Sequence, residues 1–545
     1  MPNQKSLKKI FSLAAVFLLI FLALAARLAW LDLVRTQSLT VMAGAQRSKK
    51  IDYYQYNRGD FFDCLGRRLT GIESICLTLF PGMIKDEEKL AQELAGVLEM
   101  PQTAVLARIQ SNLKQSGLPF ILKTNLSQEE ADALKEKQIP GVFLLPLAAR
   151  YGPNLPAVHL LGFASIESGG VYKGRSGLEK QYDQLLAGRI SPQAIALVDD
   201  KGRQIPGFGF SLLPPSEDKE DLSANIYLTL NLDYQEILEQ CLAPYSGAAV
   251  LLDANNGDIL ALASSPKIDP YLLEVPREGD AYINKAFALY PPASTFKLLL
   301  ALADLETGNQ APDDFFCEGS LLLPGGRRLN CWDKKGHGQE DLKWALANSC
   351  NPYFANLSLL LGGATIRRYF NLCGLDKQTV TGYTLPQGDY LNFNDRVDGD
   401  IVNVAVGENG VQLSPLLVAQ LYAIVANGGK RVFPRLLLYL EDKNGRVEYP
   451  VRTPERVIKE ETAAYLREAL RLAVTGGTGH NLQDMSIESS GKTGTSQHKG
   501  VWFAGFSPAE TPRFVLVVYI ENGGAGGREA AAVFRDTIER IALLD

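Results

Sequence analysis

The chain has 545 residues, of which 46% are hydrophobic and 21% charged, and its formal net charge is -6. The length exceeds what one hydrophobic core usually serves, so we expect at least two domains, and the composition excludes a wholly disordered chain. The negative charge argues against nucleic acid as a partner, because phosphates require a dense basic face.

The N-terminus predicts a membrane anchor. Residues 1–9 contain three lysines, and residues 10–31 are mainly apolar, carry Arg27 as their one charge, and are long enough to span a bilayer. Basic residues on the N-terminal side favour a cytoplasmic tail over residues 1–9, which places the rest of the chain outside. The alternative is a signal peptide cleaved near Ala23-Leu24-Ala25, and both interpretations predict export.

Residues 32–220 are predicted to form a mixed domain. Ser127 and Glu130 form a capping box, which predicts a helix that continues to about Lys137. The polar, proline-containing run Leu213–Asp221 is typical of a linker, so we expect the second domain to cover residues 221–545.

The second domain is predicted to be an α+β domain. Its first two strands are joined by a turn and its last three strands lie near the C-terminus, with helices between them, which indicates an antiparallel five-stranded sheet covered by helices. The predicted elements are strands at Ala248–Asp253, Ile259–Ala263, Val501–Phe506 and Phe514–Ile520, a strand that carries Lys492, a helix that begins near Ser294, and a closing helix at Ala530–Leu544.

Ser294 and Lys297 are the first candidate catalytic residues. Acyl transfer through serine needs a nucleophile, a base and an oxyanion hole, and Ser-x-x-Lys on a helix places an amine one turn from the hydroxyl. The same pattern begins at six other serines, so the start of an apolar helix behind Pro291-Pro292 is what distinguishes Ser294. An ordinary helix N-cap is the alternative role for this serine.

Two further motifs accompany this pair. Ser349-Cys350-Asn351 lies between two predicted helices, and Lys492-Thr493-Gly494-Thr495 contains the single Lys-Thr-Gly of the chain. A strand with a lysine, hydroxyls and a glycine can bind a carboxylate while a substrate backbone approaches closely. The alternatives are a helix N-cap for Asn351 and an ordinary turn for Lys492. The three motifs in this order match the signature of penicillin-binding proteins and class A β-lactamases.

Over most of its length the chain resembles class B penicillin-binding proteins. Segment 290–297 resembles the nucleophile region of the family, with Ala293 where glycine is common. Segments 331–333, 336–338 and 345–354 resemble the region of the second motif, and segments 490–495 and 502–506 that of the third. Segments 58–63, 176–179 and 182–183 resemble a non-catalytic pedestal. Cys64-Leu65 departs from the family pattern. Residues 521–524 and 526–527, with Gly336-His337-Gly338, resemble the elongation subgroup.

The resemblance implies a pedestal over residues 32–220 and a serine β-lactamase-like transpeptidase domain over residues 221–545, without a glycosyltransferase domain. It implies a peptidoglycan D,D-transpeptidase that β-lactams acylate. The implied roles are nucleophile for Ser294, base for Lys297, proton transfer for Ser349, donor-peptide binding for Asn351, carboxylate binding for Lys492, Thr493 and Thr495, close substrate approach at Gly494, and an oxyanion hole from the N–H groups of Ser294 and Thr495.

The resemblance also implies partners. These are peptidoglycan stem peptides and nascent glycan derived from lipid II, β-lactams, the bacterial cytoplasmic membrane, and a polytopic glycan polymerase that contacts residues 54–59 and the pedestal. The transpeptidase domain is then extracytoplasmic on a single-pass anchor.

Rival classes and a metal site fit the residues less well. A class A β-lactamase would need a Glu-x-x-x-Asn segment between Ser294 and Lys492, and none is present. A β-lactam receptor that signals across the membrane and a catalytically silent scaffold are two further rival classes. No metal or cofactor is expected, because no second histidine lies within zinc-ligand spacing of His337. Cys317 and Cys331 are the one pair considered for a disulfide, and seven free thiols are the alternative.

Overall fold

The computed structural model describes residues 4–34, 48–52, 58–115, 119–152, 154–166, 172–190, 192–197, 210–213, 220–270, 282–308, 312, 314–497, 500–524 and 527–544. The chain divides into two compact units, the first made of Met1–Tyr56, Ile72–Gly152 and Ile190–Glu220, the second of Asn57–Gly71, Pro153–Arg189 and Asp221–Asp545. Most of the predicted linker, residues 214–219, lies outside the described residues, as do residues 53–57.

The first unit begins with the predicted apolar helix. Helix α1 spans Gln4–Val34, and its window Ser12–Leu31 has a mean hydropathy of 2.4 with none of it buried by protein. Among the described residues it is the one helix both long and apolar enough to cross a bilayer. Its exposed leucines and phenylalanines would be unfavourable in water, because about 25 cal/mol is lost for each Å² of apolar surface left in solvent.

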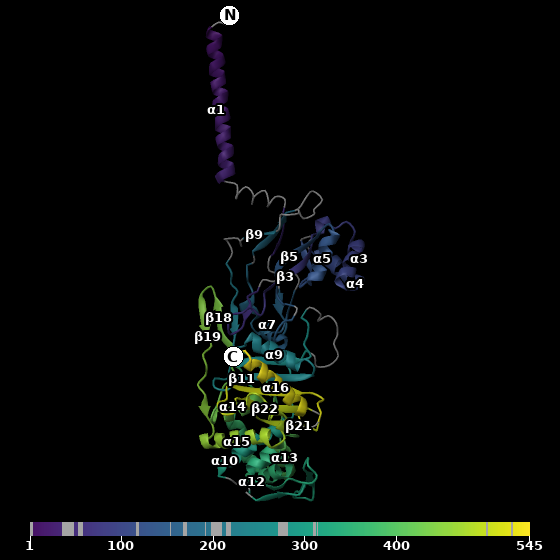
Figure 1. The fold of residues 1–545 in the computed structure, drawn as a ribbon, viewed down its shortest axis with the longest axis vertical. Helices are drawn as coiled ribbons and strands as arrows, with labels where there is room; N and C mark the ends of the chain where they lie inside the picture. Colours follow the sequence, from purple (N-terminus) through teal and green to yellow (C-terminus); the bar gives the residue numbers. More distant parts are fainter. Residues whose placement is uncertain are drawn as a thin grey trace. The chain divides into compact units, whose positions relative to one another are not determined.

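The rest of the first unit combines two three-stranded sheets with a small group of helices (Figure 1). The elements are β1 Ser48–Asp52, β3 Ile72–Leu79, η1 Pro81–Met83, α3 Glu87–Leu98, α4 Gln102–Gln115, β4 Phe120–Lys123, α5 Gln128–Lys137, β5 Val142–Ala149, β8 Gln193–Leu197 and β9 Phe210–Leu213. The sheets have the orders β4-β3-β5 and β1-β8-β9. The predicted capping box is confirmed, because Ser127 accepts from the Glu130 N–H and the Glu130 side chain accepts from the Ser127 N–H.

The second unit starts with segments that precede the predicted linker. Their elements are β2 Phe61–Phe62, α6 Val158–Leu161, β6 Ala164–Ile166, β7 Tyr172–Gly174, α7 Gly177–Gln181 and α8 Asp183–Leu186. Buried Arg58 pairs with Glu179 at 3.0 Å and with Asp183 at 2.5 Å, so all three segments that carry the pedestal resemblance are joined by one ion-pair network. The second unit also contains a four-stranded sheet of order β19-β18-β10-β2, where β10 is Asn225–Leu228, β18 Leu437–Asp442 and β19 Gly445–Glu448.

A five-stranded antiparallel sheet forms the centre of the second unit, as the sequence predicts. Its order is β12-β11-β23-β22-β21, where β11 is Gly247–Asp253, β12 Ile259–Ser265, β21 Ser490–Thr495, β22 Val501–Ser507 and β23 Phe514–Ile520. Side chains of a strand alternate between its faces, and nearly every residue of β11, β22 and β23 is buried, so both faces must be covered.

Helices cover both faces of this sheet (Figure 1). On one face α9 (Leu232–Leu242) and α16 (Arg528–Ala542) pack on a core that includes Leu251 and Phe503. On the other lies α14 (Pro415–Ala426), whose twelve residues are all buried, as expected of a helix that is apolar on every side.

The remaining elements of the second unit complete the transpeptidase-like part. They are β10 Asn225–Leu228, η2 Ala293–Phe296, α10 Lys297–Thr307, β13 Phe315–Cys317, β14 Ser320–Leu322, β15 Arg328–Asn330, β16 Gly338–Glu340, α11 Leu342–Ala347, α12 Asn351–Leu372, α13 Asp398–Ala405, β17 Lys430–Arg431, β18 Leu437–Asp442, β19 Gly445–Glu448, β20 Glu455–Arg456, α15 Glu460–Thr475 and η3 His480–Leu482. The predicted helix start near Ser294 is confirmed by η2 and α10.

Candidate active site

The first motif lies where η2 continues into α10. The 3-10 turn Ala293–Phe296 contains Ser294, and Lys297 is the first residue of the α-helix. Residues three apart eclipse one another in a 3-10 turn, so Ser294 and Lys297 share one side of the helix start. Ala293 has a φ of 50°, a left-handed conformation that favours glycine. This backbone requirement explains why glycine is common at the position that Ala293 occupies here.

The second motif is the junction between α11 and α12. The Ser349 N–H donates to the Leu346 carbonyl and the Cys350 N–H donates to the Ala345 carbonyl, the pair of bonds that defines a Schellman motif. Ser349 occupies the left-handed position of this motif, with a φ of 58°, where glycine is usual. Cys350 is then the N-cap of α12, whose first residue is Asn351.

Lys297 joins the first motif to the second. Its Nζ donates to the Ser349 carbonyl at 2.8 Å, to Ser349 Oγ at 3.3 Å and to Asn351 Oδ1 at 2.6 Å. The Lys297 side chain is fully buried. Residues predicted from two separate motifs are therefore connected through one amine.

The third motif is the edge strand β21. A Cβ atom built at Gly494 would lie 3.2 Å from Cγ2 of Thr295, so β21 and η2 are in direct contact there. Lys492 is fully buried, and its Nζ donates to the Thr493 carbonyl at 2.9 Å. Thr495 is the last residue of β21 and is exposed. The predicted strand is confirmed, and it places the third motif beside the turn that contains Ser294.

Burial controls the charges of the two lysines. Desolvation lowers the pKa of Lys297 to about 8, while thiolate charge at Cys350 and Cys331 acts in the opposite direction. Burial and, second, the positive charge of Lys297 lower the pKa of Lys492 well below its ordinary value. Burial is thus the main cause for both amines, and the repulsion between the two ammonium groups lowers the pKa of Lys492.

Thr478 is a site residue that the sequence did not reveal. Its Oγ1 lies 2.8 Å from Thr493 Oγ1 and 3.4 Å from Lys492 Nζ, and its N–H donates to the Ala347 carbonyl at 3.1 Å. Thr478 therefore ties the third motif to the helix that ends in the second. The available signal was its setting in the glycine-rich run Gly476-Gly477-Thr478-Gly479.

Two acidic residues near the motifs, Glu408 and Asp333, accept hydrogen bonds from the backbone. Glu408 is buried and its Oε1 accepts from the Gln497 N–H at 3.0 Å, just beyond the end of β21. Asp333 accepts from the Lys335 N–H at 2.9 Å in the turn before His337. Glu408 thus supports the end of the third motif, whereas Asp333 shapes a turn.

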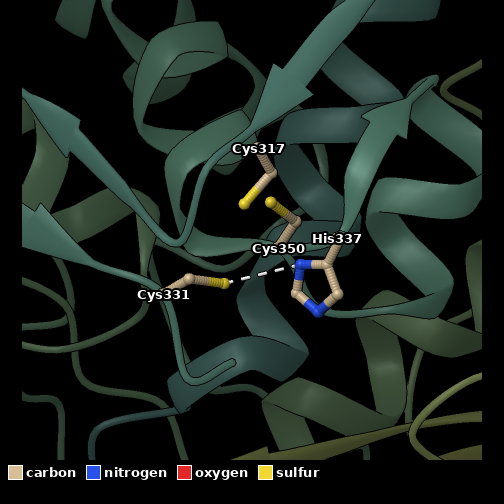
Figure 2. A group of neighbouring side chains, drawn as sticks. All are labelled: Cys317, Cys331, His337 and Cys350. Atoms are coloured by element: carbon tan, nitrogen blue, oxygen red, sulfur yellow. Dashed lines mark hydrogen bonds between the residues drawn. The ribbon is translucent and has the colours of Figure 1, made fainter. Parts of the chain in front are cut away.

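A second group of reactive side chains adjoins the second motif. Figure 2 shows that Cys317, Cys331, His337 and Cys350 point toward one another, and their ligand atoms all lie within 4.8 Å of each other. We call these four residues the thiol–imidazole cluster. Cys331 Sγ is 3.5 Å from His337 Nδ1, and Glu340 Oε1 is 3.8 Å from the same nitrogen. The donor set of three sulfurs and one imidazole is one that binds zinc in structural sites.

The electrostatics of the cluster favour thiolate. Hydrogen bonding with Cys350 lowers the pKa of the Cys331 thiol, and the same contact, with burial, raises the pKa of Cys350. Burial raises the pKa of the Glu340 carboxyl to about 7. Cys331 therefore loses its proton more readily than Cys350.

The cluster bears on one expectation from the sequence. The expectation of no metal considered only histidines near His337 in sequence, whereas the fold supplies three cysteine ligands from separate segments. The two residues considered for a disulfide, Cys317 and Cys331, do belong together in space, but all seven cysteines are free.

Comparisons with known proteins agree with this geometry. The family model described as the penicillin-binding protein transpeptidase domain matches residues 247–539, and the model of the penicillin-binding protein dimerisation domain matches residues 54–207. The first model alone covers more than half of the chain. The chain belongs to the penicillin-binding protein transpeptidase family.

Particular relatives cover nearly the whole chain. Stage V sporulation protein D of Bacillus subtilis is 27% identical over 96% of this chain and 84% of its own length. Peptidoglycan D,D-transpeptidase MrdA of Acinetobacter baumannii is 26% identical over 96% of this chain and 86% of its own length. The penicillin-binding protein PBP2 from Helicobacter pylori has a similar fold, with a TM-score of 0.65, 20% identity, and coverage of 91% of this chain and 99% of that chain.

Proposed function

We propose that this chain is a serine D,D-transpeptidase that cross-links peptidoglycan stem peptides and that β-lactams acylate. The observation that carries the proposal is the buried Lys297 amine, which bonds Ser349 and Asn351 while it shares one helix start with Ser294. Family membership and a relative named as a peptidoglycan D,D-transpeptidase support the same activity.

Acylation uses the first two motifs. Ser294 Oγ attacks the carbonyl between the two terminal D-alanines and transfers its proton to the neutral amine of Lys297. The N–H groups of Ser294 and Thr495 stabilise the oxyanion, a contribution of about 10² to 10³ in rate for each donor. The C–N bond then breaks, and Ser349, 3.3 Å from Lys297 Nζ, passes a proton to the departing D-alanine amine.

The second and third motifs hold the substrate. Asn351 binds the donor peptide, and Lys492, Thr493 and Thr495 hold its terminal carboxylate, with Gly494 leaving room for the substrate backbone. Support comes from the Thr478 bridge, which fixes Thr493 relative to the second motif. An amine of a neighbouring stem peptide then attacks the acyl-enzyme, which forms the cross-link and returns the proton to Ser294.

The arrangement in the cell is part of the proposal. Residues 1–9 form a cytoplasmic tail, 10–31 a single-pass anchor in the bacterial cytoplasmic membrane, 32–220 a pedestal and 221–545 an extracytoplasmic transpeptidase domain. The apolar helix α1 and the two family-model ranges, 54–207 and 247–539, support this division. The partners are nascent glycan derived from lipid II and a polytopic glycan polymerase that contacts residues 54–59 and the pedestal.

A labelled penicillin tests the proposal. We expect a stable covalent adduct that peptide mass spectrometry locates on Ser294, and none on Ser294→Ala. Ser111→Ala is the matched control, because Ser111 also opens a Ser-x-x-Lys pattern, on the exposed side of α4. An undiminished adduct on Ser294→Ala would refute the assignment of the nucleophile.

The lifetime of the adduct separates the rival classes. A transpeptidase should keep the penicilloyl group during a chase in buffer, whereas rapid release would identify a β-lactamase. No adduct on the wild-type chain would leave the silent scaffold as the better explanation. A donor peptide with an added acceptor amine should then give a cross-linked product.

A further inference from the structure

A second cavity lies at the start of β21, between α11, α15 and the turn that joins β22 to β23. Its volume is about 440 Å³, which is within the range of small-molecule binding sites. The polar residues that line it and matter here are Lys343 of α11, Arg467 and Arg471 of α15, Ser490 of β21 and Glu510 of the turn. None of these residues has a role in the proposed reaction, so the cavity is a separate candidate site.

Two charged groups on this cavity have no partner of opposite charge. Within the described part of the chain, neither the half-buried Arg467 nor the exposed Glu510 forms an ion pair or a side-chain hydrogen bond. Lys343, in contrast, pairs with the exposed Glu468 at 2.7 Å. Because Arg467 and Glu510 line one cavity without pairing to each other, a ligand with one negative and one positive end would satisfy both.

The wall of the cavity also contains a buried hydroxyl without a partner. Ser490 is 1% exposed, and its Oγ makes no hydrogen bond among the residues that the structure describes. Such a group destabilises the folded chain, because it has left water without gaining a new bond. A carboxylate held by the Arg467 guanidinium would accept a hydrogen bond from this hydroxyl as well. The negative end of the ligand is therefore expected at Arg467 and Ser490, and the positive end at Glu510.

The size and the remaining lining of the cavity favour a short peptide. A sphere of this volume is about 9 Å across, and an extended chain spans at most about 3.3–3.6 Å for each residue, so about two to three residues fit. Ala464, Leu472 and Ala509 supply apolar surface for small side chains. A guanidinium binds a carboxylate through two parallel hydrogen bonds, and a carboxylate accepts from an ammonium, so the free ends of a peptide match the two unpaired charges.

The cavity adjoins the elements that carry the second and third motifs. Helix α11 lines it and ends two residues before Ser349. The Arg471 guanidinium donates to the Ser489 carbonyl at 3.0 Å, directly before β21. Ser490 and Lys492 are two residues apart on this strand, so their side chains share one face. Since β21 is an edge strand bonded to β22 alone, a ligand that joins it to α11 and α15 would restrain both motifs.

We propose that this cavity binds a short peptide with free ends and small side chains, and that the bound peptide speeds the acylation of Ser294. The carboxylate of the peptide bonds Arg467 and Ser490, and its ammonium bonds Glu510. The effect on acylation rests on the proposed function, whereas the binding does not. Coupling between two sites is typically about 5- to 150-fold, so the peptide should raise the acylation rate at least about fivefold.

Titration calorimetry with trialanine tests the binding on the full-length chain in detergent. We expect saturable binding of about one peptide per chain, weakened at least about tenfold by Arg467→Ala and by Glu510→Ala, since each removes a charge-assisted contact. Arg396→Ala is the matched control, because Arg396 is an exposed arginine of the same unit that does not line the cavity. Absence of saturable binding to the wild type would overturn the proposal.

Prior acylation separates this cavity from the active site. Trialanine should bind the untreated chain and the chain acylated beforehand with penicillin equally well, because the penicilloyl group on Ser294 blocks the active site alone. Loss of binding after acylation would place the peptide in the active site and overturn the proposal.

Blocked forms of the probe test the two ends of the peptide. N-acetylated trialanine lacks the ammonium, so it should bind the wild type as weakly as free trialanine binds Glu510→Ala. The C-terminal amide lacks the carboxylate and should match Arg467→Ala in the same way. Equal binding of acetylated and free trialanine would indicate a site for anions alone and overturn the assignment of Glu510.

Ser490→Ala should change stability and binding in opposite directions. The variant loses an unpartnered hydroxyl, so its thermal unfolding without peptide should occur at a higher temperature than that of the wild type. It also loses one hydrogen bond to the peptide, which should weaken trialanine binding about fivefold. Lower thermal stability together with unchanged binding would show that the hydroxyl serves the fold and refute its contact with the ligand.

The rate of acylation by a fluorescent penicillin tests the effect on the reaction. Saturating trialanine should raise this rate at least about fivefold in the wild type and in Arg396→Ala, and should leave the rate of Arg467→Ala unchanged. An unchanged rate in the wild type, at a concentration that saturates the calorimetric signal, would overturn the effect on acylation. Failure of the proposed function gives a different result, since no Ser294 adduct would form with or without the peptide.

Discussion

The buried amine of Lys297 predicts a specific pH dependence of acylation. Burial lowers its pKa from the ordinary value of 10.5 to about 8. At pH 7 about one-tenth of the amines would then be neutral, compared with about 0.03% at the ordinary value, a ratio of about 300. The acylation rate should therefore rise about tenfold per pH unit below pH 7.5 and level off above about pH 9.

Stopped-flow acylation by a fluorescent penicillin between about pH 6 and about pH 9.5 measures this profile. Lys297→Arg is the control, because a guanidinium does not lose its proton and should give no adduct at any pH. Circular dichroism at each pH confirms that the chain stays folded. A rate that stays flat across this range, or an adduct on Lys297→Arg, would refute Lys297 as the base.

The same pKa change predicts how stability varies with pH. The folded-state pKa lies below the unfolded one, so between about pH 8 and pH 10.5 the unfolded chain binds more protons and stability rises with pH. Below about pH 8 the buried amine is charged. This charge lowers the free energy of unfolding by about 3 kcal/mol, at about 1.36 kcal/mol for each unit of pKa change. Thermal unfolding should therefore shift upward across this alkaline window and less so in Lys297→Met.

Three further substitutions test other parts of the structure. Arg58→Ala leaves Glu179 buried without its partner at 3.0 Å and should lower the free energy of unfolding by about 3–5 kcal/mol. The control Arg446→Ala breaks an exposed ion pair and should lower the free energy of unfolding by at most about 1 kcal/mol. Equal losses in the two variants would contradict this prediction. Ser127→Ala removes a helix cap and should cost about 1 kcal/mol by thermal unfolding, with no change in acylation. Thr478→Val removes the 2.8 Å bond to Thr493 and should slow acylation about fivefold, since a net hydrogen bond contributes about 1 kcal/mol; an unchanged rate would show that the bond does not hold the third motif.

Elements with strong local signals were predicted from sequence. The strand Phe514–Ile520 has the bounds expected, because an apolar run between turn residues leaves little choice of limits. The helix after Ser127 follows from a capping box that acts within four residues. The three motifs were found for the same reason, since each lies at the edge of a helix or strand with a recognisable start.

Contacts between distant segments could not be read in this way. His337 has no sequence neighbour that suggests a ligand set, and its companions arrive through the β13–β16 pairing and the turn at Cys350. Thr478 likewise meets Thr493 only after α15 has packed against β21. The geometry of Lys297 was also incomplete, because its bonds to Ser349 and Asn351 depend on how α10 packs on α12.

The serine in the Schellman motif shows that activity and folding make opposing demands on one residue. Glycine would adopt the φ of 58° without strain, so Ser349→Gly should raise the free energy of unfolding by about 1 kcal/mol. The same change removes the hydroxyl 3.3 Å from Lys297 and should slow acylation. Selection for stability alone would therefore drive this position toward a slower enzyme, and the serine persists only where turnover is selected as well.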